Sequence, residues 1–172
     1  MELDAFAVTT DPLEIRTPVQ FKALAHPFRH RLLFALGAGP ATLSQLAARL
    51  GAAKGTVAHH LKVLTEAGMV REAHRRQVRG GTERYHERAF RRLVGEAADA
   101  GATAALFGAF AEEVAGDPDP LVHLRQLRLT PTQARRLRST LDTLVGDAEE
   151  APPGEARYGV LVSLYRHPAQ VR

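Results

Sequence analysis

The chain has 172 residues, of which 45% are hydrophobic, and a formal net charge of +4. This length suits one domain, or one small domain with an extension, and supplies enough apolar residues for a packed core. The chain contains no cysteine, which excludes disulfides and thiolate metal sites. It has no apolar run of the ~18 residues that a membrane span needs and no signal-peptide pattern, so we expect a cytoplasmic protein.

The positive charge is concentrated in one part of the chain. Residues 54–92 carry ten basic and four acidic side chains, whereas residues 93–172 carry eight basic and eleven acidic ones. A local basic excess is the electrostatic signature of a polyanionic partner such as DNA. A merely solvated charged face would show both signs interspersed.

The N-terminal part carries two helix-start patterns in succession. Residues 2–9 favour a short strand. Asp11 and Thr17 are each followed by a proline and, three residues on, by Glu14 or Gln20. A capping residue, a proline at the first helical position and an acid or amide at the third predict a helix start at each place.

A third helix is predicted to begin at His26 and Pro27 and to end at the glycines and proline of residues 37–40. His26 and His30 lie four residues apart, a spacing that can bind a metal ion. The sequence places no further ligand nearby. We therefore interpret His26 as a helix cap and His30 as a surface or hydrogen-bonded polar residue.

The segment 42–64 predicts two short helices joined by a tight turn. Thr42 and Gln45 form a capping-box pattern at the start of the first helix, and Gly51 suits its end. The second helix opens near Lys54. Its predicted buried stripe consists of Val57, Leu61 and Leu64. This pattern is typical of a helix-turn-helix motif, whose second helix enters the DNA major groove, although an ordinary helical hairpin would show it too.

A basic β-hairpin is predicted directly after the helix pair. Residues 69–73 and 82–86 read as two strands, and residues 74–81 form a polar, basic connection that ends in two glycines. In this position the hairpin would be a wing. Arginines at its tip could reach DNA phosphates or the adjacent minor groove.

Three blocks of the sequence resemble the ArsR-type winged-helix transcriptional regulators. They are residues 21–29, 55–64 and 66–70, and the hairpin of residues 75–85 looks like an actinobacterial branch of that family. The resemblance covers about residues 20–92. It implies a homodimer that binds a dyad-symmetric operator in double-stranded DNA and usually represses transcription.

The sequence departs from the family pattern in two respects. The family commonly has serine at the positions of Ala53 and Ala58; Ala53 would leave the second helix without a side-chain cap, at a cost of roughly 1 kcal/mol. Metal-sensing members of the family use thiolates or Asp and His pairs. This chain has no cysteine, and the predicted helix after the wing offers Glu96 and Asp99 without histidine. We therefore predict no metal site and no cofactor.

The candidate DNA-binding residues fall into three groups. Residues 54–56 lie at the N-terminus of the recognition helix, where backbone N–H groups and the helix dipole favour phosphate. A second group lies on the side of that helix expected to face the groove, with His60 one step round, and a third group lies on the wing. The set comprises Lys54, Gly55, Thr56, Ala58, His59, His60, Lys62, Arg75, Arg76 and Arg79.

The C-terminal part is expected to be helical and to end in a strand. We predict one or two helices over residues 89–116, a short apolar and basic stretch over 121–129 that could be helical, a capped helix over 130–146 and a strand over 158–165. The exposed apolar strand would pair with residues 2–9 or with a second chain.

Three domains follow from this pattern: an N-terminal arm (1–16), a winged helix-turn-helix domain (17–92) and a C-terminal region (93–172). The last would form a dimer interface alone, or would also hold a small-molecule effector against apolar residues. The candidates for such a pocket are Phe107, Phe110 and Tyr158.

The expected fold is mainly α with a small β-hairpin wing (α+β). The sequence contains no nucleophile elbow, phosphate loop or metal triad, so we do not expect an enzyme. The sequence favours a homodimeric repressor that binds its operator through recognition helix 54–66 and wing 74–81. The alternative is a winged-helix module for protein–protein interaction, which would not need the basic wing.

Overall fold

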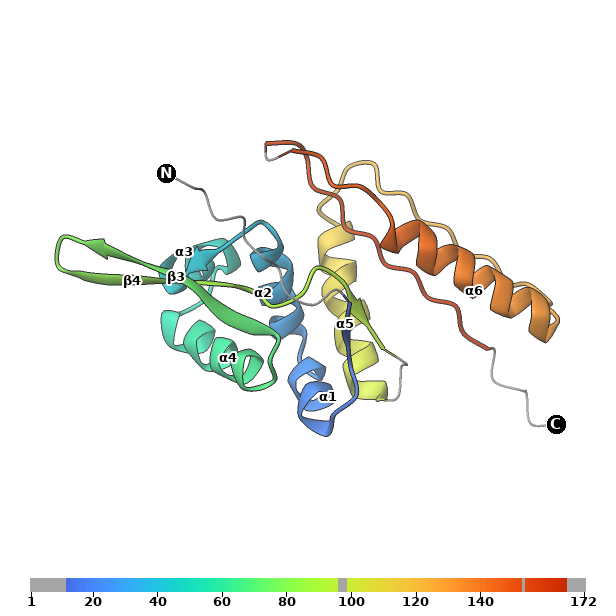
Figure 1. Ribbon diagram of the computed structural model, residues 1–172, viewed down its shortest axis with the longest axis horizontal. Helices are drawn as coiled ribbons and strands as arrows, with labels where there is room; N and C mark the ends of the chain where they lie inside the picture. The colour runs from blue at the N-terminus through green and yellow to red at the C-terminus, as the bar shows by residue number, and fades with distance from the viewer. Residues whose placement is uncertain (1–11, 96–98, 153, 167–172) are drawn as a thin grey trace. The chain divides into compact units, whose positions relative to one another are not determined.

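The computed structural model describes residues 12–95, 99–152 and 154–166 (Figure 1). The fold is α+β and mainly helical, as predicted. The chain forms two compact units, residues 1–118 and 119–172. The helix of residues 100–114 belongs to the first unit because it packs against the first two helices of the chain.

The first unit contains five helices and two small sheets among its described residues. Its elements are β1 (Leu13–Glu14), α1 (Pro18–Leu24), α2 (Pro27–Gly37), β2 (Ala41–Thr42), α3 (Leu43–Leu50), α4 (Lys54–Glu66), β3 (Val70–Val78), β4 (Gly81–Arg88), β5 (Leu93–Val94) and α5 (Ala100–Val114). Helices α2, α3 and α4 pack against one another, and the β3–β4 hairpin extends beyond them (Figure 1).

Capping boxes fix the starts of three helices. Thr17, Thr42 and Thr130 each accept a hydrogen bond from the backbone of a glutamine three residues on, and that glutamine bonds back to the threonine backbone. These capping boxes confirm the helix starts predicted at these positions. Gly51 ends α3 with φ of 60°, a left-handed conformation that favours glycine.

The first described strand of the chain was not predicted. Leu13 and Glu14 form β1, which pairs in parallel with β5, so the helix start predicted after Asp11 is wrong. The strand predicted over residues 2–9 lies outside the described residues. In the second sheet, the order is β2–β4–β3 and both pairs are antiparallel.

The core of the first unit lies between the helices and the base of the hairpin. Its fully buried large side chains are Leu32, Leu46, Val57, Leu64, Met69 and Val70. Since residues from α2, α3, α4 and β3 share this cluster, the recognition helix and the wing are anchored in one core.

The region after the wing differs from the predicted helix over residues 89–116. Phe90 is buried in the core and Leu93 and Val94 form β5, whereas α5 begins at Ala100 after the cap Asp99. The buried face of α5 consists of small residues, Ala105 and Ala109, and Phe107 is exposed. Helix α5 therefore approaches its neighbours through alanines, a pattern that a search for large apolar residues does not detect.

The second unit contains one helix among its described residues, α6 (Pro131–Gly146). Residues 121–129 are not helical, which corrects that expectation. Residues 158–165 pair as a strand with no other described residue. Their predicted partners, residues 2–9 or a second chain, lie outside the described residues, so that pairing stays a prediction. None of the described residues of this unit is buried.

Candidate nucleic-acid interface

The N-terminus of α4 is open to solvent. Lys54, Gly55 and Thr56 are exposed, and the preceding Ala53 makes no side-chain capping hydrogen bond. The first backbone N–H groups of a helix have no partner within the helix, and here no cap competes for them. This end of α4 can therefore donate hydrogen bonds to an anion such as a phosphate.

One side of α4 is exposed along its length. Ala58, His59 and Lys62 are exposed, whereas Val57, Leu61 and Leu64 are buried, as the helical spacing predicts. Lys62 Nζ lies 3.8 Å from a carboxylate oxygen of Glu66, one turn later. The exposed side thus carries a small residue, an imidazole and an ammonium group.

His60 lies on the buried side of the recognition helix and not on this face. It is 8% exposed, and its ring centroid lies 4.6 Å from that of His26 and 4.9 Å from that of Phe28. Burial lowers the pKa of His60 to about 4, and the neighbouring His26, Arg29 and His59 add to this effect. His60 therefore packs α4 against the start of α2, and we remove it from the set of DNA contacts.

The wing is longer than predicted, and its tip is shorter. Strands β3 and β4 pair from Val70 with Arg88 to Val78 with Gly81. The connection is the two residues Arg79 and Gly80, with Gly80 at φ of 100°, and Gly81 is already part of β4. Arg79 therefore lies at the extreme end of the hairpin, while Arg75 and Arg76 lie on strand β3.

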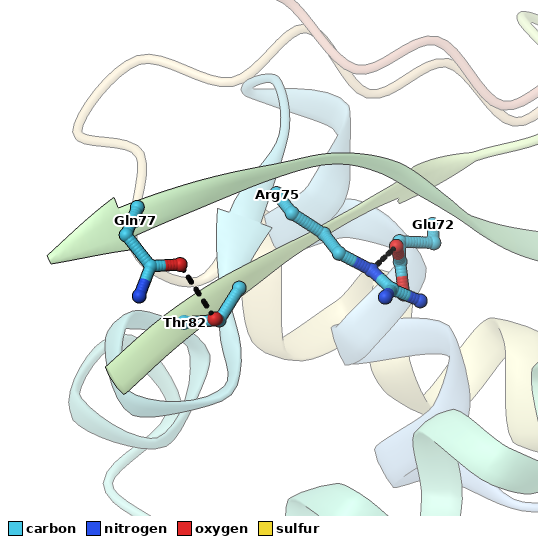
Figure 2. Close-up of polar contacts among 4 residues, drawn as sticks. All are labelled: Glu72, Arg75, Gln77 and Thr82. Atoms are coloured by element: carbon cyan, nitrogen blue, oxygen red, sulfur yellow. Dashed lines mark hydrogen bonds and ion pairs between the residues drawn. The ribbon is translucent and has the colours of Figure 1, made fainter.

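The three wing arginines differ in their partners (Figure 2 shows the first contact). Arg75 forms an ion pair with Glu72, and Arg76 lies 3.2 Å from a carboxylate oxygen of Glu83. Among the described residues, Arg79 has no ion-pair partner. Of these three, Arg79 is thus the most available to an external phosphate, since Arg75 and Arg76 would first exchange a carboxylate.

Cross-strand contacts stiffen the hairpin. The Thr82 hydroxyl donates a hydrogen bond to Gln77 Oε1 at 2.9 Å (Figure 2), and the rings of His74 and Tyr85 stack at 4.4 Å. At the base, Arg71 donates to the buried carboxylate of Glu87 at 2.8 Å. These pairs stabilise the hairpin.

Sequence reasoning missed one basic residue of the wing. Arg84 is exposed and lies directly opposite Arg75 in the β3–β4 register. Two like charges at opposite positions repel each other, which an anion between them would relieve. The register of β3 against β4 would have revealed this pairing. That register depends on the connection at the hairpin tip, which has two residues.

The N-terminal histidines have structural roles. His26 Nδ1 accepts a hydrogen bond from the backbone N–H of Phe28 at 3.1 Å, and His30 Nε2 lies 2.8 Å from the buried carbonyl of Leu24. Burial lowers the pKa of His30. Within the described ranges, no group of three or more histidine, aspartate or glutamate side chains is arranged to hold a metal ion.

The predicted pocket residues do not come together within one unit. Phe107 is on α5 of the first unit and Tyr158 lies in the second, and both are exposed. No helix in the described part of the chain is long and apolar enough to cross a membrane.

Comparisons with known proteins bear on the first unit. A family model for a helix-turn-helix domain matches residues 24–73, which run from the end of α1 into β3. A solved structure of a possible transcriptional regulator for arsenical resistance is 27% identical and covers 78% of this chain and 100% of its own, at a TM-score of 0.34. The search of curated proteins gave no match.

The matched range contains the whole α3–α4 pair, and the hairpin that follows it is a basic wing. The resemblance seen in the sequence is thereby confirmed at the level of the domain. The chain carries a helix-turn-helix domain, and a basic β-hairpin wing follows it.

Proposed function

We propose that the protein is a homodimeric transcriptional repressor that binds a dyad-symmetric DNA operator. In this proposal α4 enters the major groove and the wing contacts the backbone or the adjacent minor groove. The helix-turn-helix domain supports DNA binding and transcription regulation in general. That domain does not by itself imply a homodimer, repression or operator symmetry, which are further parts of this proposal.

The observation that carries the proposal is the pairing of an exposed, uncapped recognition helix with a projecting basic hairpin. Both elements are anchored in one core, so they approach DNA as one rigid body. Residues 54–92 supply the local positive charge that attracts a polyanion. A protein–protein module would need neither feature.

Each group of residues has a distinct role in this proposal. Residues 54–56 hold a phosphate at the helix N-terminus and fix the register. Ala58, His59 and Lys62 meet base edges or phosphates in the groove, and the wing residues Arg75, Arg76 and Arg79 add phosphate contacts. Contacts to phosphate set the affinity and its salt dependence, whereas contacts to bases set the sequence preference.

The proposal also covers location and regulation. A repressor acts where its operator is, so we propose a cytoplasmic protein with access to the chromosome. Catalysis is not part of the proposal, because the described surface is explained by DNA binding. A small-molecule effector stays a prediction.

DNase I footprinting on the DNA upstream of the protein's own coding sequence tests the proposal. A dimer of winged helices protects two half-sites whose centres are about 10 base pairs, or a multiple, apart. Two protected half-sites with inverted sequence would support it. A single protected half-site, or protection that does not depend on sequence, would contradict the dyad, and no protection on any fragment would favour the protein-interaction module.

A further inference from the structure

The second unit has a large apolar surface without a core. None of its described residues is buried, and ten of its large hydrophobic side chains are exposed, against two, Val19 and Phe107, in the described part of the first unit. The ten are Leu121, Val122, Leu124, Leu127, Leu129, Leu144, Tyr158, Val160, Val162 and Tyr165. Soluble proteins that act as monomers rarely leave so many apolar side chains exposed together, which points to a surface that a partner covers.

The helix of this unit shows that a covering layer is missing. Ala134, Leu137, Leu141 and Val145 recur along one stripe of α6, and all four are only half-buried. Leu144 beside them is 69% exposed. An amphipathic helix gains most of its stability by packing that stripe against another element, and here the packing is incomplete.

Two extended segments of the unit have unpaired backbones. Residues 121–129 and 157–166 belong to no helix or strand, and no backbone hydrogen bond joins them to another described residue. Residues 158–165 are nevertheless rich in valine, leucine and tyrosine, which favour strands. Extended apolar segments with free N–H and C=O groups pair readily with another strand.

We propose that the second unit is a dimerisation module in which residues 121–129 and 158–165 pair as β-strands with the same segments of a second copy of this chain. The strands and the apolar stripe of α6 would then enclose a core shared by two copies. This inference rests on the proposed function in one respect, since a dyad-symmetric operator requires two copies.

The charge of the unit favours a second copy over a charged partner. Residues 119–172 carry eight basic and six acidic side chains, a nearly balanced mixture. Two copies can therefore approach without strong repulsion, and the two-fold symmetry of a dimer matches each segment with its own counterpart. DNA, by contrast, would be attracted to residues 54–92.

The available area also suits a dimer. Covering one large apolar side chain removes on the order of 100 Å² from water, so ten of them offer on the order of 1,000 Å² per copy. A stable protein–protein interface buries about 800 Å² per partner. The exposed side chains of the second unit alone would reach that size.

The test is the oligomeric state of the full-length protein without DNA, measured by analytical ultracentrifugation over nanomolar to micromolar concentrations. We expect a dimer, and we expect Val162→Asp and Leu127→Asp to raise its dissociation constant about 30-fold or more, because each places a charge in the shared core. Val19→Asp on α1 is the control, since Val19 is an exposed valine like Val162 (57% against 45% exposed) but lies in the first unit.

Hydrogen exchange detected by mass spectrometry tests the strand pairing itself. Amides of residues 121–129 and 158–165 should be protected in the dimer and exchange freely after dilution or in Val162→Asp. Protection of α2, α3 and α4 in every variant would show that the first unit stays folded. The inference is overturned by a monomer at all concentrations, by a dimer that only Val19→Asp disrupts, or by these amides being protected in a monomer.

The test is independent of DNA binding. A dimer that depends on Val162 but binds no specific DNA would support this inference and contradict the proposed function. A protein that stays monomeric without DNA but binds DNA with sequence preference would contradict this inference, and the DNA binding of the proposed function would stand without its homodimer.

Discussion

The residues of the proposed DNA surface differ in how freely they can bind a phosphate. Arg79 sits at the hairpin tip without an ion-pair partner among the described residues, whereas Arg75 and Arg76 are paired with Glu72 and Glu83. An arginine that must release a carboxylate gains less from a phosphate than a free one. The tip residue should therefore contribute most.

We predict that Arg79→Ala weakens binding to all DNA sequences. It should also reduce the magnitude of the negative slope of log K against log salt by about one unit, because one phosphate contact is lost. Arg76→Ala should have the same effect to a smaller degree. Fluorescence anisotropy titrations at several salt concentrations measure both. Arg16→Ala, an exposed arginine before α1, serves as the control, and an equal loss in this variant would contradict a specific role of the wing.

His59 is predicted to act on sequence preference more than on affinity. It is exposed on the groove-facing side of α4, where a side chain meets base edges. His59→Ala should change the ranking of single-base operator variants by about 1 kcal/mol or more at one position, while binding to unrelated DNA stays the same. An unchanged ranking would mean that another side of α4 faces the groove.

His60 makes the stability of the fold depend on pH. Its pKa is about 4 in the folded protein against an ordinary value near 6.5, so between these values the unfolded chain binds a proton that the folded chain does not. Burial lowers the pKa of His30 and His86 in the same direction. Stability should fall as the pH drops from about 6.5 to about 4.

Urea unfolding at pH 7 and pH 5 measures this effect. His60→Leu keeps an apolar side chain in the packing against Phe28 and removes the titration, so it should lose less stability between the two pH values than the unchanged protein does. An equal loss in both proteins would show that His60 does not carry the dependence.

At the scale of elements, the capped helix starts and the helix pair could be predicted from the sequence. Thr42 with Gln45, and Gly51 after α3, follow local rules that do not depend on the rest of the fold. The strands β1 and β5 could not, because each has two residues and exists only through its partner far away in the chain. The buried alanines of α5 were also missed. They are buried because α5 packs closely against other helices, and the sequence alone does not show that contact.

For the candidate site, as for the elements, the features that follow local sequence rules could be predicted and those that depend on distant contacts could not. The exposed residues of α4 and the wing arginines follow from helical spacing and from local charge. His60 was misjudged because its burial depends on His26 and Phe28 of α2, which only the tertiary fold brings to it. Arg84 was missed because its position opposite Arg75 depends on the exact strand register.

The uncapped start of α4 offers a direct test of the helix as described. Ala53 has an extended backbone and makes no capping bond, so Ala53→Ser should supply one and raise the free energy of unfolding by about 1 kcal/mol. Ala58→Ser, inside the same helix, should lower it by about 0.5 kcal/mol, since serine is a weaker helix former than alanine. Urea denaturation compares the two, and equal effects would contradict the cap position.

At the scale of the whole molecule, the two units differ in whether their described residues form a core. The first has a continuous core that anchors both α4 and the wing, so it presents them to DNA as one surface. The second has no buried residue in its described part and, in our proposal, gains its core from a second copy. Dimerisation would then place two recognition helices in two half-sites.

The central claim is that the chain binds a specific DNA sequence. Fluorescence anisotropy of the purified protein on its own upstream DNA and on a scrambled duplex, from ~50 to 200 mM salt, tests it most directly. We predict tight binding to the upstream DNA that remains well above binding to the scrambled duplex at the highest salt, because base contacts survive when phosphate contacts are screened. Equal binding to both duplexes, lost together as salt rises, would contradict it.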